Sequence, residues 1–182
     1  MKKMTTLFKK NMENLSRVTK TVNPENIWVY DIGIATRKFD GTACAILNGR
    51  LYKRFDSKMK RKVPDGAIEC SPPDEITGHH PFWVPCLRQD PSNKYHFEAF
   101  DKENHLPDGT YELIGEKING NKENILGHML LPHGANILDL HNYSYDSIFS
   151  FLRENFIEGI VFKKNLDGRM CKIRRKDFGL KW

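Results

Sequence analysis

Short alternating runs of apolar and polar residues dominate the chain from Ile27 onward and predict β-strands. The clearest pair covers residues 42–47 and 50–55, with Asn48-Gly49 between them. An Asn-Gly pair between two strand-like runs is typical of a hairpin, because both residues of such a turn take positive φ. We therefore expect an antiparallel hairpin in which Leu47 faces Arg50.

Three further segments show a regular period. Residues 110–114 alternate like a strand, and residues 158–164 and 169–174 flank a turn-type segment, which predicts a second hairpin. Residues 145–155 have apolar positions at helical spacing, with Ser144 or Asp146 available as the N-cap. Two hairpins, further strands and few helices indicate an α+β fold built on antiparallel sheet.

Two other segments are less regular. Residues 5–20 are expected to form a basic helix that ends before the Val22-Asn23-Pro24 break. Residues 63–91 hold six of the nine prolines, so we expect an irregular surface excursion there, long enough to be functional. Because no internal repeat or low-complexity linker divides the chain, the expected organisation is a basic segment over 1–22 followed by one domain over 23–182.

The composition fits a globular protein inside the cell. The chain has 182 residues, 39% of them hydrophobic and 29% charged, and a mean hydropathy of −0.59. No apolar run approaches the roughly 20 residues of a membrane helix, and the N-terminus lacks a signal-peptide core. The four cysteines show no Cys-x-x-Cys spacing, which disfavours a zinc site or a disulfide framework. We expect no membrane partner and a location in the cytoplasm or another intracellular reducing compartment.

Positive charge is concentrated at the two ends. Residues 1–22 carry six Lys/Arg against one Glu, and residues 163–182 carry eight against two Asp, while the whole chain has a net charge of +6. Basic ends on an acidic middle favour a polyanionic partner, either a triphosphate or a nucleic acid. Solvated tails would give the same pattern, so charge alone leaves both interpretations open.

The sharpest feature for chemistry is Lys38-Phe39-Asp40-Gly41, directly before the first hairpin. A lysine attacks phosphorus only when its amine is neutral, and burial and nearby cations favour that state. On an extended segment Asp40 shares the face of Lys38 and could hold a metal or a ribose hydroxyl, while Gly41 lets backbone approach a ligand. An exposed turn could carry the same four residues, so the rest of the sequence has to decide.

Charged residues elsewhere supply that context. The hairpin register brings Arg54 close to Gly41, where its guanidinium could bind phosphate oxygens in pairs. Glu112 and Glu158 lie inside apolar strand patterns, and two carboxylates across a cleft can hold a hydrated Mg²⁺. Lys172-Ile173-Arg174 puts two cations on one strand face, as two contacts to a triphosphate require. Taken alone, each of these residues also fits a structural role at a strand end.

Five segments, in order along the chain, resemble motifs I, Ia, III, IV and V of the covalent nucleotidyltransferases: Lys38-Phe39-Asp40-Gly41, Arg54, Tyr111-Glu112-Leu113-Ile114-Gly115, Glu158-Gly159-Ile160-Val161 and Lys172-Ile173-Arg174. That superfamily comprises ATP-dependent DNA ligases, RNA ligases and mRNA capping enzymes. The flanking residues look most like a small family of ATP-dependent 5′–3′ RNA ligases, notably Ala35-Thr36-Arg37-Lys38, residues 77–85, Leu131-Pro132-His133-Gly134 and residues 172–180. The resemblance covers residues 30–182 and implies a nucleotidyltransferase (ATP-grasp-like) domain of antiparallel sheets flanked by helices.

The resemblance also implies roles in catalysis. Lys38 would become covalently bonded to AMP, with ATP as the substrate and Mg²⁺ or Mn²⁺ as the metal. Asp40, Glu112 and Glu158 would serve the ribose and the metal, and Lys172 would orient the α-phosphate and neutralise its charge.

Further candidates for nucleotide binding follow from the same motifs. Arg174 would join Lys172 at the α-phosphate, Arg54 would contact a phosphate or the ribose, and Ile160 would pack on the adenine. Gly41 completes the set as the small residue of motif I.

Three residues are candidates for RNA contacts. Arg175 and Lys176 extend the basic cluster after motif V, and Trp83 could stack on a base from the Pro-rich stretch. A packed structural loop around Trp83 is the alternative. A metal site at His79 and His80 is disfavoured, because adjacent side chains of an extended segment point apart.

Two departures from the family pattern affect the interpretation. Arg37 stands where many of these ligases have an acidic residue, which leaves the basis of base selectivity open. The chain also ends eight residues after Arg174, so we expect no oligonucleotide-binding-fold domain and no motif VI. Candidates for holding the β- and γ-phosphates are then Arg175, Lys176 or the basic N-terminal segment.

The expected function is ATP-dependent joining of RNA 5′-phosphate and 3′-hydroxyl ends, through a lysyl-AMP intermediate and an adenylylated RNA end. A capping-type guanylyltransferase or a DNA ligase is the alternative within the superfamily, although each normally needs motif VI. A non-catalytic RNA-binding or nucleotide-sensing module is the alternative from another class, and retention of Lys38 together with Glu158 argues against it.

Overall fold

The computed structural model describes residues 4–57, 62–74, 78–103 and 105–182. They form two compact units: a large-sheet unit, Asp40–His133, and a terminal unit, Met4–Phe39 with Gly134–Trp182. This grouping differs from the organisation expected from the sequence, which divides the chain at residue 22. The division at residue 22 stays a prediction. Within the described ranges, no helix combines the length and apolar character needed to cross a membrane.

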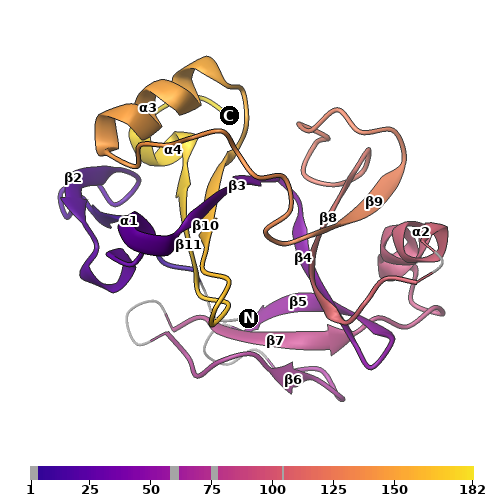
Figure 1. The fold of residues 1–182 in the computed structure, drawn as a ribbon. Helices are drawn as coiled ribbons and strands as arrows, with labels where there is room; N and C mark the ends of the chain where they lie inside the picture. Colours follow the sequence, from indigo (N-terminus) through magenta and orange to yellow (C-terminus); the bar gives the residue numbers. More distant parts are fainter. Residues whose placement is uncertain (1–3, 58–61, 75–77, 104) are drawn as a thin grey trace. The chain divides into compact units, whose positions relative to one another are not determined.

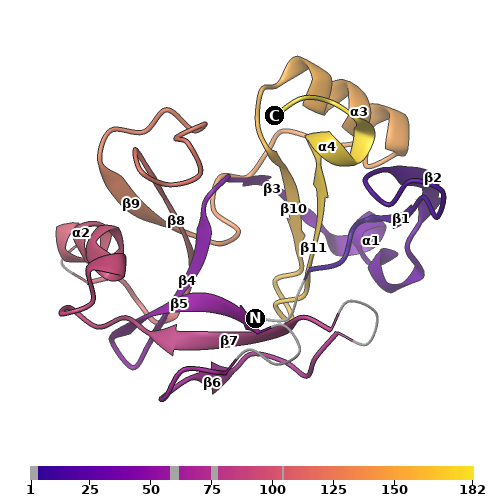
Figure 2. The same ribbon diagram turned by 180° about the vertical axis from the view of Figure 1, so that it is seen from behind.

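The large-sheet unit contains an antiparallel sheet of six strands in the order β6-β7-β5-β4-β8-β9. One helix, α2, lies alongside β9 (Figures 1 and 2). The core of this unit comprises Cys44, Ile46, Leu51, Ala99, Tyr111, Leu113 and Leu130. The bounds of its elements are β4 (Thr42–Leu47), β5 (Arg50–Ser57), β6 (Ile68–Glu69), β7 (His80–Pro85), η2 (Pro91–Asn93), α2 (Lys94–Lys102), β8 (Gly109–Gly115) and β9 (His128–Pro132).

The hairpin predicted around Asn48-Gly49 is confirmed. Asn48 has φ 50° and Gly49 has φ 69°, and Leu47 pairs with Arg50 across the turn. The Asp108 carboxylate accepts the backbone N–H of Asn48 at 2.6 Å and of Gly49 at 3.0 Å, so the turn is fixed from outside as well as by its own residues.

The irregular excursion expected over residues 63–91 is wrong for its second half, where β7 pairs along its whole length with β5. Its residues Phe82, Trp83 and Val84 are all buried, so apolar burial outweighs the proline signal. Pro81 is compatible with the strand because its backbone carbonyl faces β6, which has only two residues. On that side of the strand the absence of a proline N–H is tolerated.

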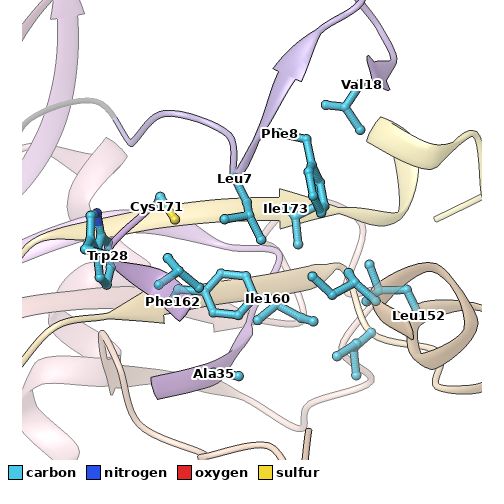
Figure 3. Close-up of a cluster of buried hydrophobic side chains, with 13 residues drawn as sticks. Leu7, Phe8, Val18, Trp28, Ala35, Leu152, Ile160, Phe162, Cys171 and Ile173 are labelled. Atoms are coloured by element: carbon cyan, nitrogen blue, oxygen red, sulfur yellow. The ribbon is translucent and has the colours of Figure 1, made fainter. Parts of the chain in front are cut away.

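The terminal unit is built on an antiparallel sheet in the order β11-β10-β3, which supports the second predicted hairpin. Its core, shown in Figure 3, gathers Leu7, Phe8, Val18, Trp28, Val29, Ala35, Ile148, Leu152, Ile157, Ile160, Phe162, Cys171 and Ile173. The bounds of its elements are β1 (Phe8–Lys10), β2 (Val18–Val22), η1 (Pro24–Asn26), α1 (Val29–Ile32), β3 (Ile34–Lys38), α3 (Tyr145–Glu154), β10 (Gly159–Lys163), β11 (Met170–Arg174) and α4 (Arg175–Phe178).

The helix predicted at residues 145–155 is confirmed as α3. Of the two candidate caps the structure uses Ser144, whose side chain accepts the backbone N–H of Ser147. Ile148 and Leu152 lie four residues apart on its buried face, as the helical spacing of the apolar positions requires.

The helix expected over residues 5–20 is wrong, because β1 and β2 form an antiparallel hairpin there. Ahead of β1, the backbone joins β11: Lys172 N–H donates to Thr5 O and Leu7 N–H donates to Lys172 O, each at 2.9 Å. These bonds to a strand far along the chain replace the local bonds that a helix would have made.

Two asparagines in the turn between β1 and β2 add a local reason. Asn11 and Asn14 accept hydrogen bonds at their side chains from the backbone N–H groups of Glu13 and Ser16. Such bonds offer the backbone an alternative to helical hydrogen bonding, which favours the turn.

Candidate active site

The sheet of the terminal unit presents three predicted site residues on one face. Gly159 of β10 pairs with Lys38 on one side and with Arg174 on the other, and Val161 pairs with Lys172. Directly opposed residues of antiparallel strands point to the same face, and so do residues two apart on one strand. Lys38, Lys172 and Arg174 therefore project from a common face.

Lys38 and Glu158 form an ion pair on that face. Glu158 directly precedes β10, and its Oε2 accepts a hydrogen bond from Lys38 Nζ. The two side chains are 16% and 12% exposed, and the amine also donates to Phe39 O at 3.1 Å. The candidate nucleophile is therefore largely withdrawn from water and oriented by a carboxylate.

Lys172 lies in the field of the same charges. Burial lowers its pKa to about 8, and the positive charges of Arg174 and Lys38 act in the same direction. Glu158 and Asp177 oppose them without reversing the shift. The amine of Lys172 thus changes its charge close to physiological pH, unlike an exposed lysine.

Arg174 is held by Asp177, a fully buried carboxylate in α4. The guanidinium donates from Nε to Asp177 Oδ2 at 3.1 Å and from Nη2 to Oδ1 at 3.0 Å. Lys10 Nζ donates to the same Oδ1 at 2.7 Å. Burial acts to raise the pKa of Asp177, but these hydrogen bonds outweigh it and hold the pKa below its ordinary value.

The expectation that Ile160 packs on adenine is corrected by the strand register. Ile160 is fully buried and belongs to the core of the terminal unit with Phe162, two residues along β10 (Figure 3). Its neighbour Val161, 5% exposed, points to the opposite face, where Lys172 lies. Val161 is therefore the apolar residue of motif IV on the face that carries the charged residues.

Glu112 belongs to a separate cluster in the large-sheet unit. Its Oε1 accepts the backbone N–H of Gly41 at 3.2 Å, and its Oε2 lies 2.8 Å from His133 Nε2, which donates because a carboxylate only accepts. The side chains of Glu112 and His133 are 14% and 12% exposed. Within the described ranges, His133 Nδ1 is buried without a hydrogen-bond partner.

Asp40 is held by the connection between β8 and β9. Asn119 Nδ2 donates to Asp40 Oδ1 at 3.0 Å and to Gly41 O at 2.8 Å, and Asp40 N–H donates to Glu123 Oε1 at 2.8 Å. Lys122 Nζ lies 3.8 Å from Asp40 Oδ2. No role for these three residues was predicted from the sequence, because their partner lies about eighty positions away.

The structure gives a reason for glycine at position 41 that the sequence did not show. A Cβ atom there would lie 2.3 Å from Leu113 O and 2.7 Å from Glu112 Cγ. Gly41 thus permits close approach of its own sheet, and the expected close approach of a ligand stays a prediction.

Arg54 and Trp83 are paired across β5 and β7. Arg54 donates from Nε to Asp56 Oδ1 at 3.0 Å, and its guanidinium lies 5.8 Å from the Trp83 ring centroid. Trp83 is only 4% exposed in a strand, so the packed alternative describes it, and base stacking would need the ring to become exposed. The phosphate or ribose contact of Arg54 stays a prediction.

Arg175 and Lys176 differ in exposure. Arg175 is buried and donates to three backbone carbonyls: Leu152 O, Asn155 O at 2.9 Å and Lys181 O at 2.7 Å. Its guanidinium fixes the chain end to α3, so the structure corrects its assignment as an RNA contact. Lys176 is exposed and stays a candidate.

The metal roles of Asp40, Glu112 and Glu158 stay predictions, because Asp40 and Glu112 belong to the large-sheet unit and Glu158 to the terminal unit. Across the described ranges, no three His, Cys, Asp or Glu side chains are grouped to hold a metal ion. Mg²⁺ commonly binds one or two carboxylates together with substrate phosphates, so the carboxylates present still suit it.

The site residues thus fall into two sets. The terminal unit brings together Lys38, Glu158, Lys172 and Arg174, and the large-sheet unit brings together Asp40, Gly41 and Glu112. The sequence missed several partners of these sets: Lys10, Asn119, Glu123, His133, Val161 and Asp177. Only Asp177 left a local signal, because a carboxylate three residues after the residue before a helix can accept the backbone N–H of that residue, as Asp177 Oδ2 does from Arg174 at 2.9 Å.

Comparison with known proteins supports the motif resemblance. A model of the family described as RNA ligase 1 matches residues 102–182. RNA ligase 1 of Rattus norvegicus is 28% identical over 82% of this chain and 68% of its own length, and that of Mus musculus is 29% identical over the same shares. The chain is similar to these RNA ligases. RNA ligase 1 of Pongo abelii is 33% identical over 60% of this chain and 43% of its own length.

The region matched by the RNA ligase family model contains part of the candidate site. Glu112, Glu158, Lys172 and Arg174 lie within it, whereas Lys38 lies before it. The role of Lys38 therefore depends on its motif and on its ion pair with Glu158.

Proposed function

We propose that this protein is an ATP-dependent RNA ligase that works through a lysyl-AMP intermediate on Lys38. The observation that carries the proposal is the ion pair of Lys38 with Glu158, on the sheet face shared with Lys172 and Arg174. An isolated, exposed lysine would have neither a largely buried carboxylate as its partner nor a second lysine with a lowered pKa on the same sheet face. Relationship to RNA ligases supplies the substrate class.

In the first step, Lys38 Nζ attacks the α-phosphorus of ATP. A nitrogen–phosphorus bond forms, the bond from phosphorus to the bridging oxygen breaks, and pyrophosphate leaves. The amine must lose a proton to attack, and Glu158 Oε2 is the acceptor in direct contact with it. AMP then passes to an RNA 5′-phosphate, and an RNA 3′-hydroxyl displaces AMP to seal the ends.

Charge neutralisation is the main contribution of the remaining residues. Lys172 and Arg174 would bind the phosphate oxygens on which negative charge accumulates. Glu158 would help to hold Mg²⁺ or Mn²⁺, which would supply a further positive charge. Asp40, Gly41, Arg54 and Glu112 are proposed to serve the nucleotide as their motifs imply.

Transfer of label to the protein tests this proposal. The chain is mixed with α-labelled ATP and Mg²⁺ or Mn²⁺, denatured, and examined for label migrating at 21.2 kDa. We expect label in the parent and none in Lys38→Arg, while Lys20→Arg, an exposed lysine on β2, keeps it. Label from GTP instead of ATP would indicate a capping-type enzyme, and RNA binding without any adduct would indicate a binding module.

A further inference from the structure

We infer that Lys10 and Arg174 together bind the β- and γ-phosphates of the nucleotide, as a two-cation site assembled on Asp177. The inference rests on the proposed function, which places the α-phosphorus at Lys38. It assigns Lys10, a residue of the N-terminal hairpin, to the pyrophosphate that leaves.

The two cations are held side by side by one atom. Lys10 Nζ and Arg174 Nη2 both donate to Asp177 Oδ1, at 2.7 and 3.0 Å. The Asp177 side chain is 0% exposed, whereas those of Lys10 and Arg174 are 30% and 20% exposed. The acid is therefore inaccessible to a ligand, and the two cations are accessible.

Both cations keep donors for a ligand. An ammonium has three N–H groups and a guanidinium has five, and Asp177 accepts one from Lys10 and two from the Arg174 side chain. Asp177 is the only hydrogen-bond partner of either side chain within the described ranges. One carboxylate against two cations leaves a net positive charge, which suits phosphate oxygens.

The direction of the reaction points the leaving group towards this pair. Phosphoryl transfer proceeds with the attacking and leaving atoms roughly in line. Lys38 lies on β3, β10 follows it across the sheet, and Arg174 lies on β11 beyond. A group that leaves along the sheet face, away from Lys38, therefore moves towards Arg174 and Lys10.

The fold of the N-terminal segment supplies Lys10 at this position. Residues Thr5 and Leu7 are hydrogen bonded to Lys172 of β11, so β1 starts from the edge of the same sheet. Along β1, Lys10 is half-buried at Asp177 while Lys9 is exposed. Lys9 is thus a matched control, with the same charge one residue away but exposed.

The test compares two ligands that differ only in the phosphates at issue. Binding of α,β-methylene-ATP, which cannot transfer AMP, and of AMP is measured by calorimetry for the parent, Lys10→Met, Lys10→Arg and Lys9→Met. We expect Lys10→Met to weaken binding of the ATP analogue roughly tenfold, about 1.4 kcal/mol, and to leave AMP binding unchanged, because the variant loses one charge-assisted hydrogen bond to phosphate. Lys10→Arg should retain most of the affinity, and Lys9→Met should match the parent.

Equal losses for both ligands, no loss for the analogue, or the same loss in Lys9→Met would each overturn the inference. A second measurement on the unmodified chain covers the case in which Lys10→Met fails to fold. Acetylation of Lys10, mapped by mass spectrometry, should slow at least threefold in saturating tripolyphosphate, with Lys9 as the internal reference. Failure to protect Lys10 selectively would also overturn it.

These results are separable from those on the proposed function. Selective loss of the analogue in a protein that never forms an adduct would leave the phosphate site standing and remove the ligase mechanism. An adduct on Lys38 with unchanged binding in Lys10→Met would do the reverse.

Discussion

Lys38 and Glu158 are hydrogen bonded to each other although 120 positions separate them in the chain. The pairing of Gly159 with Lys38 across β10 and β3 sets this contact, because Glu158 directly precedes the paired glycine. Either residue alone would be an ordinary strand-end charge. Together they form a largely buried ion pair.

Glu158→Gln is expected to reduce the rate of adduct formation roughly 100-fold or more, the typical effect of removing an acid–base group. The amide keeps the shape of the side chain but cannot accept the proton from Lys38 with comparable affinity. Glu154→Gln is the matched control, because Glu154 is 67% exposed at the end of α3. An unchanged single-turnover rate in Glu158→Gln would show that the contact is structural only.

The rate of adduct formation should decline at alkaline pH, because Lys172 loses its positive charge there. Its pKa is lowered to about 8, chiefly by burial, so its positive charge is present below that pH and is lost above it. If the charge neutralises the α-phosphate, the rate falls as the pH rises through about 8. Lys172→Arg stays charged and should keep its rate up to pH 9.5, measured by single-turnover labelling. A decline at the same pH in both proteins would assign it to another group.

The strands and α3 were predictable because their signals are local. Asn48-Gly49 requires positive φ, Ser144 precedes an apolar stripe at helical spacing, and these signals do not depend on the rest of the chain. The N-terminal hairpin was not predictable in this way, because Lys172 supplies the backbone partners that decide it. In β7, burial of Phe82, Trp83 and Val84 outweighs the tendency of the prolines to interrupt a strand. The sequence alone does not show which side chains become buried.

The candidate site shows the same contrast between local and long-range signals. The residue types of Lys38, Glu158, Lys172 and Arg174 were evident in their motifs. Choosing between Ile160 and Val161 required the register with β3 and β11, because a shift of one residue exchanges the two faces of a strand. The partners that hold the motif residues come from distant segments, so they became visible only in the fold.

Gly41→Ala is expected to destabilise the pairing of β4 with β8. The added methyl group would lie 2.3 Å from Leu113 O, which is backbone of the adjacent strand and cannot turn aside. Overpacking of this kind costs roughly 1–3 kcal/mol in the free energy of unfolding. Gly109→Ala, also in this sheet, is the control, since its Cβ would meet no atom closer than 3.7 Å. Urea titrations of both variants measure the difference, and equal midpoints would contradict the expected clash.

His96 should make the protein less stable in mild acid. It lies on the buried face of α2, and in the described part of the chain neither of its ring nitrogens has a hydrogen-bond partner. Burial, assisted by the positive charge of Lys53, lowers its pKa to about 4, and Asp90 opposes the shift only in part. The unfolded chain therefore binds a proton near pH 6.5 that the folded chain does not bind until about pH 4, so stability falls as the pH is lowered through that window.

His96→Leu removes both the titration and the unpaired ring nitrogens, so its melting temperature should exceed that of the parent by a few degrees, with the gap widening from pH 7 to pH 5. His141→Leu is the control, because His141 is 91% exposed and should leave the pH dependence unchanged. Parallel melting curves of the parent and His96→Leu across this range would show that His96 is protonated as readily in the folded chain as in the unfolded one.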